Sequence, residues 1–136
     1  METSRIDRLT PVALAFIGDA VYTLYVRERV CAEHDGVTGT LHTMVSAVVN
    51  ANMQAAVFGA LCESGELTEE ESDIARRAKN AHLHSRAKAA DSTAYHKATA
   101  LEAILGFVHL SGDGEREKSL LDKCYALAQR FLQSRA

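Results

Sequence analysis

The sequence is poor in the residues that build crosslinked or membrane-spanning proteins. Its 136 residues include one proline, no tryptophan and three cysteines, which lie far apart without a CxxC or Cys/His pattern. This usage excludes a disulfide framework and predicts buried, reduced thiols at Cys31, Cys62 and Cys124. No apolar run approaches the ~20 residues of a membrane span, and the charged N-terminus is unlike a signal peptide. We therefore expect a cytoplasmic protein without a membrane partner.

Several common catalytic motifs are also absent. The sequence has no GxxxxGK[ST] phosphate loop, no GxGxxG after a strand, no GxSxG nucleophile turn and no HExxH motif. His82 and His84 are two metal-ligand types without partners, and His42 lies in an apolar stretch typical of a core histidine. These absences disfavour P-loop, dinucleotide-binding, serine-hydrolase and zinc-protease chemistry.

The overall composition is that of an ordinary globular domain. Hydrophobic residues make up 47% of the chain and charged residues 24%, and the formal net charge is −3. The length fits a single domain over residues 1–136 and leaves no room for a second one. The slightly acidic total argues against a uniformly basic nucleic-acid coat protein, but it leaves room for a local basic patch.

The charge is unevenly distributed along the chain. Residues 76–88 carry +5 with histidines neutral, no acid occurs between Asp73 and Asp91, and the rest of the chain therefore carries −8. The basic residues of this window are Arg76, Arg77, Lys79, Arg86 and Lys88. Such a run is either a solvated face or a loop that follows the phosphates of a nucleic acid.

Helix caps and apolar spacing predict an all-α fold. Thr10 followed by Pro11 predicts the start of a first helix that extends to about residue 34. Apolar residues at helical spacing predict a second helix from about Thr40 to Glu63, with Gly65 as its C-terminal cap.

The second half of the chain contains further helix signals and no strand alternation. Thr68 and Glu71 form a capping box that opens a short helix. The remaining predicted boundaries are a loop from Asn80 to Ala90, a helix capped by Asp91, Ser92 or Thr93 and ending near Leu110, and an amphipathic helix opened by Asp113. We expect a helical bundle of about five to seven helices.

One acid lies in an apolar helix without a local counter-charge. The helical neighbours of Asp19 are Ala15, Phe16, Tyr22 and Thr23, none of which is cationic. A buried carboxylate of this kind neutralises, pairs or binds metal. The adjacent glycine at position 18 costs about 1 kcal/mol relative to alanine, which indicates a close backbone approach. The alternative is an acid at an exposed helix edge, or one paired with a distant arginine.

Glu102 repeats this pattern. It lies in another apolar helix, with Gly106 one turn later. Two glycine-marked helices with one acid each suggest that the helices face each other and hold a shared hard cation. Mg²⁺ commonly binds one or two protein carboxylates and keeps several waters, so Asp19 and Glu102 would suffice.

Together these segments resemble the ribonuclease III family. Residues 14–22, Leu-Ala-Phe-Ile-Gly-Asp-Ala-Val-Tyr, are similar to the signature helix of its catalytic domain, and residues 101–106, Leu-Glu-Ala-Ile-Leu-Gly, resemble its second signature. The similarity is closer to the compact branch called mini-ribonuclease III, where a basic segment precedes the second signature, as residues 76–81 do here. Further matches to that branch are Leu41-His42, Gln54, residues 67–71, Tyr95 and Thr99.

The resemblance implies an all-α endonuclease that works as a homodimer on double-stranded RNA without a separate double-stranded-RNA-binding domain. Members of this branch mature the precursor of the large-subunit (23S) ribosomal RNA, and a ribosomal protein that presents the RNA is a further expected partner. By motif position, Asp19 and Glu102 would be the catalytic acids and the ligands of Mg²⁺, for which Mn²⁺ could substitute. The expected RNA-binding residues are Arg76, Arg77, Lys79, Asn80, Arg86 and Lys88.

Two positions depart from the larger members of the family. Those enzymes carry further acids four residues before the signature aspartate and three before the signature glutamate, where this sequence has Ala15 and Thr99. The mini branch shares this difference. Water and RNA phosphate oxygens would then complete the metal shell.

The sequence thus predicts a Mg²⁺-dependent endoribonuclease. The alternative is a non-catalytic helical dimer that binds structured RNA or a ribosome-assembly intermediate; it would keep the basic loop but need neither Asp19 nor Glu102. A purely structural, partner-binding bundle is disfavoured by the two embedded acids.

Overall fold

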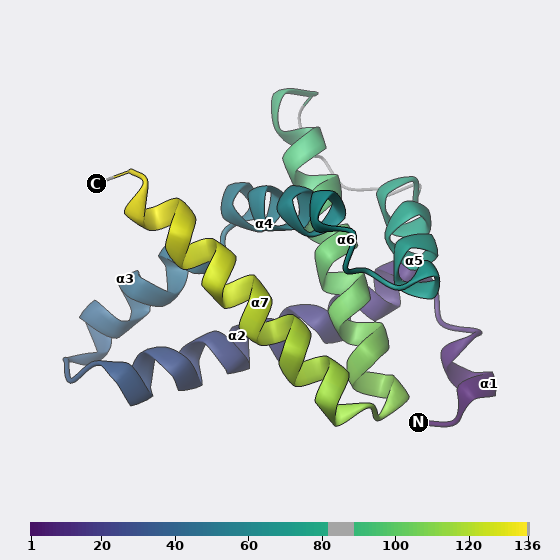
Figure 1. Cartoon of the computed structure of the whole chain (residues 1–136), viewed down its shortest axis with the longest axis horizontal. Helices are drawn as coiled ribbons and strands as arrows, with labels where there is room; N and C mark the ends of the chain where they lie inside the picture. Colours follow the sequence, from purple (N-terminus) through teal and green to yellow (C-terminus); the bar gives the residue numbers. More distant parts are fainter. Residues whose placement is uncertain (82–88, 136) are drawn as a thin grey trace.

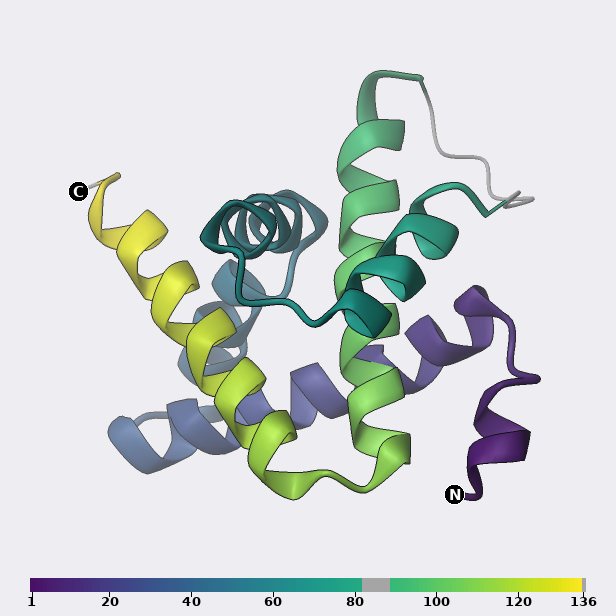
Figure 2. The same ribbon diagram turned by 45° about the vertical axis from the view of Figure 1, so that its right-hand side comes forward.

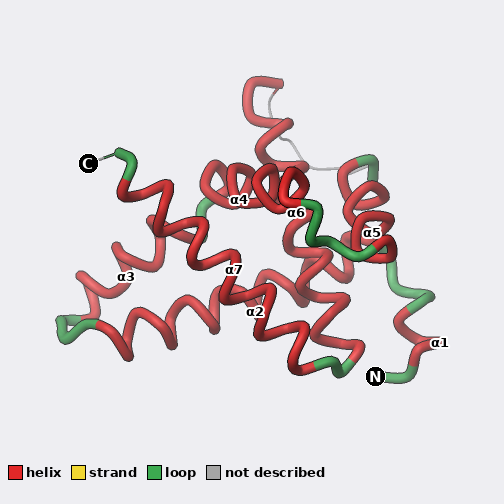
Figure 3. Tube along the Cα trace, in the orientation of Figure 1, coloured by secondary structure: helices red, strands yellow, loops and turns green. Residues whose placement is uncertain are grey.

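The computed structural model describes residues 1–81 and 89–135, and every regular element within them is a helix (Figures 1 and 3). The all-α prediction is therefore confirmed. The helices are α1 (Thr3–Ile6), α2 (Pro11–Glu33), α3 (Thr38–Val48), α4 (Ala51–Ser64), α5 (Glu69–Lys79), α6 (Ala89–Ser111) and α7 (Gly114–Gln133).

The long helix α6 is the centre of the fold. It stands across α2, with which it has its most extensive contacts, while α4 and α5 pack against it further along (Figures 1 and 2). Its residues 100, 101, 103 and 104 are fully buried. α7 runs over α4, α6 and α2 and closes the core on the other side. Because α6 contacts most of the other helices, its position determines where their functional side chains meet.

The predicted caps are present. Thr10 accepts a hydrogen bond from the Ala13 N–H at 3.1 Å and stands before Pro11 at the start of α2. Thr68 and Glu71 form the complete capping box of α5, with both hydrogen bonds at 3.0 Å. These local signals therefore place the first residues of α2 and α5 correctly.

The second predicted helix is wrong in one respect, because the chain breaks between Val48 and Ala51. The Asn50 side chain accepts a hydrogen bond from the Met53 N–H at 2.9 Å and donates to the Ser46 carbonyl at 2.9 Å, so it ends α3 and starts α4. Among the described residues no single helix is long and apolar enough to cross a membrane, while α3 and α4 together, bent by 45°, pass that test by length and composition.

Two smaller expectations also need correction, and a third lies mostly outside the described residues. α6 begins at Ala89, before the expected caps at residues 91–93, and the predicted loop from Asn80 to Ala90 falls mostly outside the described residues. Cys124 is buried as expected, but Cys31 and Cys62 are exposed. The number and spacing of the cysteines therefore did not show which thiols face solvent.

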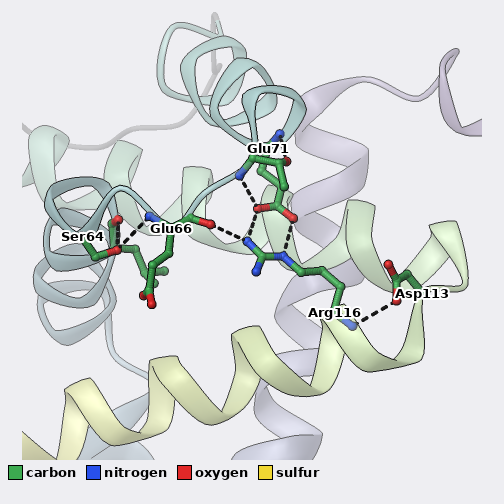
Figure 4. Close-up of polar contacts among 7 residues, drawn as sticks. Ser64, Glu66, Glu71, Asp113 and Arg116 are labelled. Atoms are coloured by element: carbon green, nitrogen blue, oxygen red, sulfur yellow. Dashed lines mark hydrogen bonds and ion pairs between the residues drawn. The ribbon is translucent and has the colours of Figure 1, made fainter.

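A buried ion pair connects α5 to α7 (Figure 4). The Glu71 side chain is only 3% exposed and accepts two hydrogen bonds from the Arg116 guanidinium, at 2.9 and 2.6 Å. Arg116 also donates to the carbonyl of Glu66 at 2.9 Å, and its own backbone N–H is capped by Asp113 at 3.1 Å. This network fixes the start of α5 against α7.

A second polar cluster connects α2 to α7. Arg29 donates a hydrogen bond to the Tyr25 hydroxyl at 2.6 Å and lies 4.4 Å from the centre of the Tyr125 ring. Tyr25 in turn donates to Asp122, and Tyr125 donates to Glu33 at 3.3 Å. Polar side-chain contacts thus join α7 to both α5 and α2, in addition to apolar packing.

Candidate active site

The backbones of α2 and α6 touch where two glycines face each other. A Cβ atom added at Gly18 would lie 1.7 Å from the carbonyl oxygen of Glu102, and one at Gly106 would lie 2.0 Å from the carbonyl oxygen of Leu14. No side chain fits either position without moving a helix. The close approach expected from the sequence is therefore present, and only glycine at both positions permits it.

This crossing brings the two predicted acids together. Asp19 follows Gly18 on α2, and Glu102 lies one helical turn before Gly106 on α6. Asp19 is exposed, whereas Glu102 is half-buried. Of the two interpretations of Asp19, a buried carboxylate and an acid at an exposed helix edge, the structure matches the second. The expectation that the two helices face each other is confirmed.

The environment of Glu102 favours its protonated form. Burial raises the pKa of its carboxyl from the ordinary 4.5 to about 7, and the neighbouring Asp19 adds to the rise through charge repulsion and a hydrogen bond. The Gln54 side chain, on α4, acts in the opposite direction as a hydrogen-bond donor toward the carboxylate. Glu102 is therefore a half-buried carboxyl group that lies between a neutral hydrogen-bond donor, Gln54, and a second acid, Asp19.

The donor set fits a hard divalent cation. Within residues 1–81 and 89–135 neither Asp19 nor Glu102 makes an ion pair with a basic side chain, so their combined charge is unbalanced by this part of the protein. Carboxylate oxygens are the ligands that Mg²⁺ prefers, and two of them with several waters make an ordinary site. The described residues hold no cluster of three or more acidic, histidine or cysteine side chains suited to a metal.

The two positions that depart from larger family members supply no ligand here. Ala15 is 6% exposed and packs in the core. Thr99 is 7% exposed and donates its hydroxyl hydrogen bond to the Tyr95 carbonyl of its own helix at 2.9 Å. Asp19 and Glu102 are thus the acids that this crossing offers to a cation.

Four of the six predicted RNA-binding residues lie in the described part of the chain. Arg76, Arg77, Lys79 and Asn80 are exposed at the C-terminal end of α5. Arg76 and Arg77 form ion pairs with Asp73, the latter at 3.2 Å, so part of their charge is balanced within α5. Arg86 and Lys88 lie outside the described residues, as do His82 and His84.

A basic residue that the sequence interpretation missed joins this segment. Lys97 on α6 and Lys79 on α5 both lie close enough to the Cys62 thiol to act on its charge. A cavity of about 230 Å³ lies between α4 and α5, with Phe58 in its wall and Cys62, Arg76, Lys79 and Asn80 among its polar lining. Lys97 is distant from the basic run in sequence, and no local pattern connects the two.

Another expectation corrected here concerns His42. It is exposed on α3 and lines a cavity of about 350 Å³ together with Arg27 and Cys31. It is therefore no core histidine, and it lies on a different pair of helices from the crossing of α2 and α6.

Comparison with known proteins matches both the sequence and the fold. The ribonuclease III domain family matches residues 12–113. The Mini-ribonuclease 3 of Enterococcus faecalis is 37% identical over 117 residues, which cover 86% of this chain and 89% of that protein. The Mini-ribonuclease 3 of a Thermoanaerobacter species is 40% identical over 114 residues, covering 84% and 79%. A crystal structure of a Fusobacterium nucleatum protein has a TM-score of 0.73 at 32% identity, covering 85% of this chain and 90% of that one.

Proposed function

Given that the chain belongs to the ribonuclease III family, in its mini-ribonuclease III branch, and is therefore an endoribonuclease of double-stranded RNA, we propose that Asp19 and Glu102 form a Mg²⁺-dependent catalytic site. The observation that carries this proposal is the glycine-on-glycine crossing that sets one acid beside the other. Mn²⁺ offers similar coordination by oxygen ligands and is expected to substitute.

In this mechanism the two acids have different tasks because their surroundings differ. Asp19, at the exposed edge, is the carboxylate that an approaching phosphodiester meets first. Glu102, half-buried on α6, would hold the ion through its carboxylate form, which burial disfavours in the absence of a cation. When bound, Mg²⁺ would supply an acidified water and neutralise charge on the phosphate.

The basic residues outside the crossing position the RNA backbone. Lys79 and Asn80 line the cavity between α4 and α5, and Lys97 on α6, like Lys79, lies near enough to the Cys62 thiol to lower its pKa by charge. Contacts of this type recognise phosphates and the shape of an A-form helix without reading its sequence. The affinity for RNA should therefore fall steeply with salt.

An exposed apolar row on α2 supports the proposal of a homodimer. Val12, Phe16 and Leu24 share one face of the helix at spacings of four and eight residues, and they are 44%, 79% and 59% exposed. Large apolar side chains in such a row are typical of a protein interface. Since Asp19 lies on the same helix, a second copy docked on this row would bring two sites to one duplex, one for each strand.

The expected substrate is the precursor of the 23S ribosomal RNA, with a ribosomal protein as the partner that presents it. Mapping the 5′ ends produced from this precursor, with and without ribosomal proteins, tests both expectations. Cuts at one position in each strand of the terminal stem support the proposal, and scattered cuts or none contradict it.

The catalytic assignment is tested by Asp19→Asn. The amide keeps the size of the side chain but removes its charge, so cleavage of duplex RNA should fall at least about 10³-fold, because a metal-held water supplies several kcal/mol to such reactions. Circular dichroism and filter binding should show an intact fold and retained RNA affinity. If Asp19→Asn cuts duplex RNA at the normal rate, the site is elsewhere. If the wild-type protein binds RNA but produces no new ends with Mg²⁺ or Mn²⁺, the chain is instead a non-catalytic RNA-binding dimer.

A further inference from the structure

One buried polar side chain lies beside the Glu102 carboxyl. Among the described residues the buried polar or charged side chains are Gln54, Glu71 and Thr99, at 4%, 3% and 7% exposure. Glu71 is explained by its capping box and Arg116, and Thr99 by the hydrogen bond to its own helix. Gln54 lies on α4, which packs against α6, and its amide acts on the Glu102 carboxyl as a hydrogen-bonding neighbour that lowers the pKa of that group.

Burying the Gln54 amide is unfavourable unless it forms a hydrogen bond, and the neighbouring Glu102 carboxyl is an acceptor for one. A primary amide that leaves water without compensation costs about 1–3 kcal/mol, and the neighbours of Gln54 on α4, Met53 and Val57, are fully buried apolar residues. The interaction that an apolar residue cannot provide is the donation of an N–H to Glu102.

The chemistry of the amide also suits a cation site better than a basic side chain would. An arginine or lysine at position 54 would orient Glu102 but would also neutralise it, and so would compete with a divalent cation. A neutral donor holds one carboxylate oxygen and leaves the negative charge of Glu102 and Asp19 for the metal. Partners of this kind behind the ligands normally tune the metal affinity.

We propose that Gln54 is a positioning residue that holds the Glu102 carboxylate toward Asp19 and so sets the affinity of the crossing for a divalent cation. This inference rests on the proposed function of Asp19 and Glu102. It extends the site from two helices to three, because α4 becomes part of the support for the metal ligands.

The test uses Gln54→Leu in the full chain, with Mn²⁺ binding measured by the electron paramagnetic resonance signal of free Mn²⁺. We expect the dissociation constant for Mn²⁺ to rise about tenfold. Thermal stability should fall only slightly, because Glu102 is half-buried and water can replace the lost donor. In cleavage assays the Mn²⁺ concentration for half-maximal rate should rise likewise, while the rate at saturating Mn²⁺ stays close to that of the wild type.

Val57→Ala is the matched control on the same helix. It removes two buried methyl groups three residues from Gln54 and should lower the melting temperature, but leave Mn²⁺ affinity unchanged. A weaker Mn²⁺ affinity in both variants would mean that any loosening of α4 has this effect, and would overturn the specific role of Gln54. Gln54→Met, which keeps the length and flexibility of the side chain, repeats the test if the leucine variant fails to fold.

The outcomes separate this inference from the proposed function. If the wild-type protein binds no Mn²⁺, the metal site itself is wrong and the role of Gln54 is refuted with it. If the wild type binds Mn²⁺, Asp19→Asn does not, and Gln54→Leu binds as tightly as the wild type, the site stands and only the positioning role of Gln54 is refuted.

Discussion

Two glutamates in this protein occupy opposite electrostatic environments. Glu71 is the more buried of the two, and burial alone would raise the pKa of its carboxyl, but hydrogen bonds from Arg116 and from the Thr68 backbone hold that pKa below its ordinary value (Figure 4). Glu102 is only half-buried, yet its pKa rises to about 7 because burial is reinforced by the Asp19 carboxylate. For Glu71 the hydrogen-bond donors outweigh burial, whereas for Glu102 burial is the largest cause of the raised pKa and the neighbouring acid adds to it.

The difference separates a structural acid from an acid available for chemistry. The charge of Glu71 is balanced by Arg116 when the chain folds, so this pair needs nothing from solution. The helix crossing places the carboxyl groups of Asp19 and Glu102 side by side without a basic partner among the described residues, so their charge is reduced by a proton on Glu102 or balanced by a cation from solution. Perturbed acids that face other acids are typical of functional sites.

The largest effect should come from removing the feature that creates the acid pair. Gly18→Ala places a Cβ 1.7 Å from the Glu102 carbonyl oxygen, a backbone atom that cannot move without α6. We expect a loss of more than ~4 kcal/mol of unfolding free energy, at the exceptional end for a single substitution, together with loss of cleavage. Urea unfolding followed by circular dichroism measures the first, and a duplex-RNA assay the second.

Gly59→Ala is the control for that substitution. Gly59 also lies inside a helix, α4, but nothing lies within 4 Å of a Cβ added there. Alanine should therefore be neutral or stabilising by up to ~1 kcal/mol, since it improves helix propensity. A Gly18→Ala variant that unfolds at the same urea concentration as Gly59→Ala would show that the two helix backbones are not in contact.

An intermediate effect is expected from Glu71→Gln, which keeps the shape of the side chain but removes the charge that Arg116 binds. At neutral pH the loss should be about 2 kcal/mol, the value of a hydrogen-bonded contact to a charged group. Glu70→Gln, at an exposed neighbouring position of α5, should change stability by less than ~0.5 kcal/mol.

The same variant has a defined pH dependence. Because the folded-state pKa of Glu71 lies below its ordinary value of 4.5, its stabilisation is present above about pH 5 and is lost as the pH falls through the folded pKa. The stability difference between the wild type and Glu71→Gln should therefore be constant from pH 7 to about 5 and shrink below about pH 4. A difference that grows on acidification would have the wrong sign for a pKa held down by Arg116.

The sequence predicts the helix starts and contact points near Glu71 and Asp19, but it does not predict the partners that are distant in sequence. Thr10-Pro11 and the Thr68–Glu71 box act within four residues, so the starts of α2 and α5 could be predicted. Gly18 could be interpreted as a contact point because its cost within an apolar helix needs a reason. Arg116, by contrast, is 45 residues from Glu71, and no local pattern pairs them.

The helix break at Asn50 and the role of Gln54 were missed for related reasons. Apolar residues on both sides of Asn50 keep helical spacing, so periodicity continues through a position where a side-chain cap competes with the helix. Gln54 could be noticed as a polar residue in an apolar helix, but its partner is on α6, and only the packing of α4 against α6 shows it. The fold class follows from local signals, while the composition of the site depends on the tertiary arrangement.

The smallest expected effect concerns a third acid, Asp73. Like Glu71 it is paired with arginine, but its partners belong to the proposed RNA-binding surface. It is half-exposed and pairs with Arg76 and Arg77 on its own helix. Asp73→Asn should therefore leave the stability of the fold almost unchanged, as for other exposed pairs. Since the two guanidinium groups are then released, affinity for duplex RNA at low salt should rise about two- to fivefold and its salt dependence should steepen. Ser72→Ala, at the exposed neighbouring position, should leave both unchanged. An unchanged affinity in Asp73→Asn would mean that Arg76 and Arg77 do not contact RNA, and that phosphate binding belongs to Lys79 and Lys97.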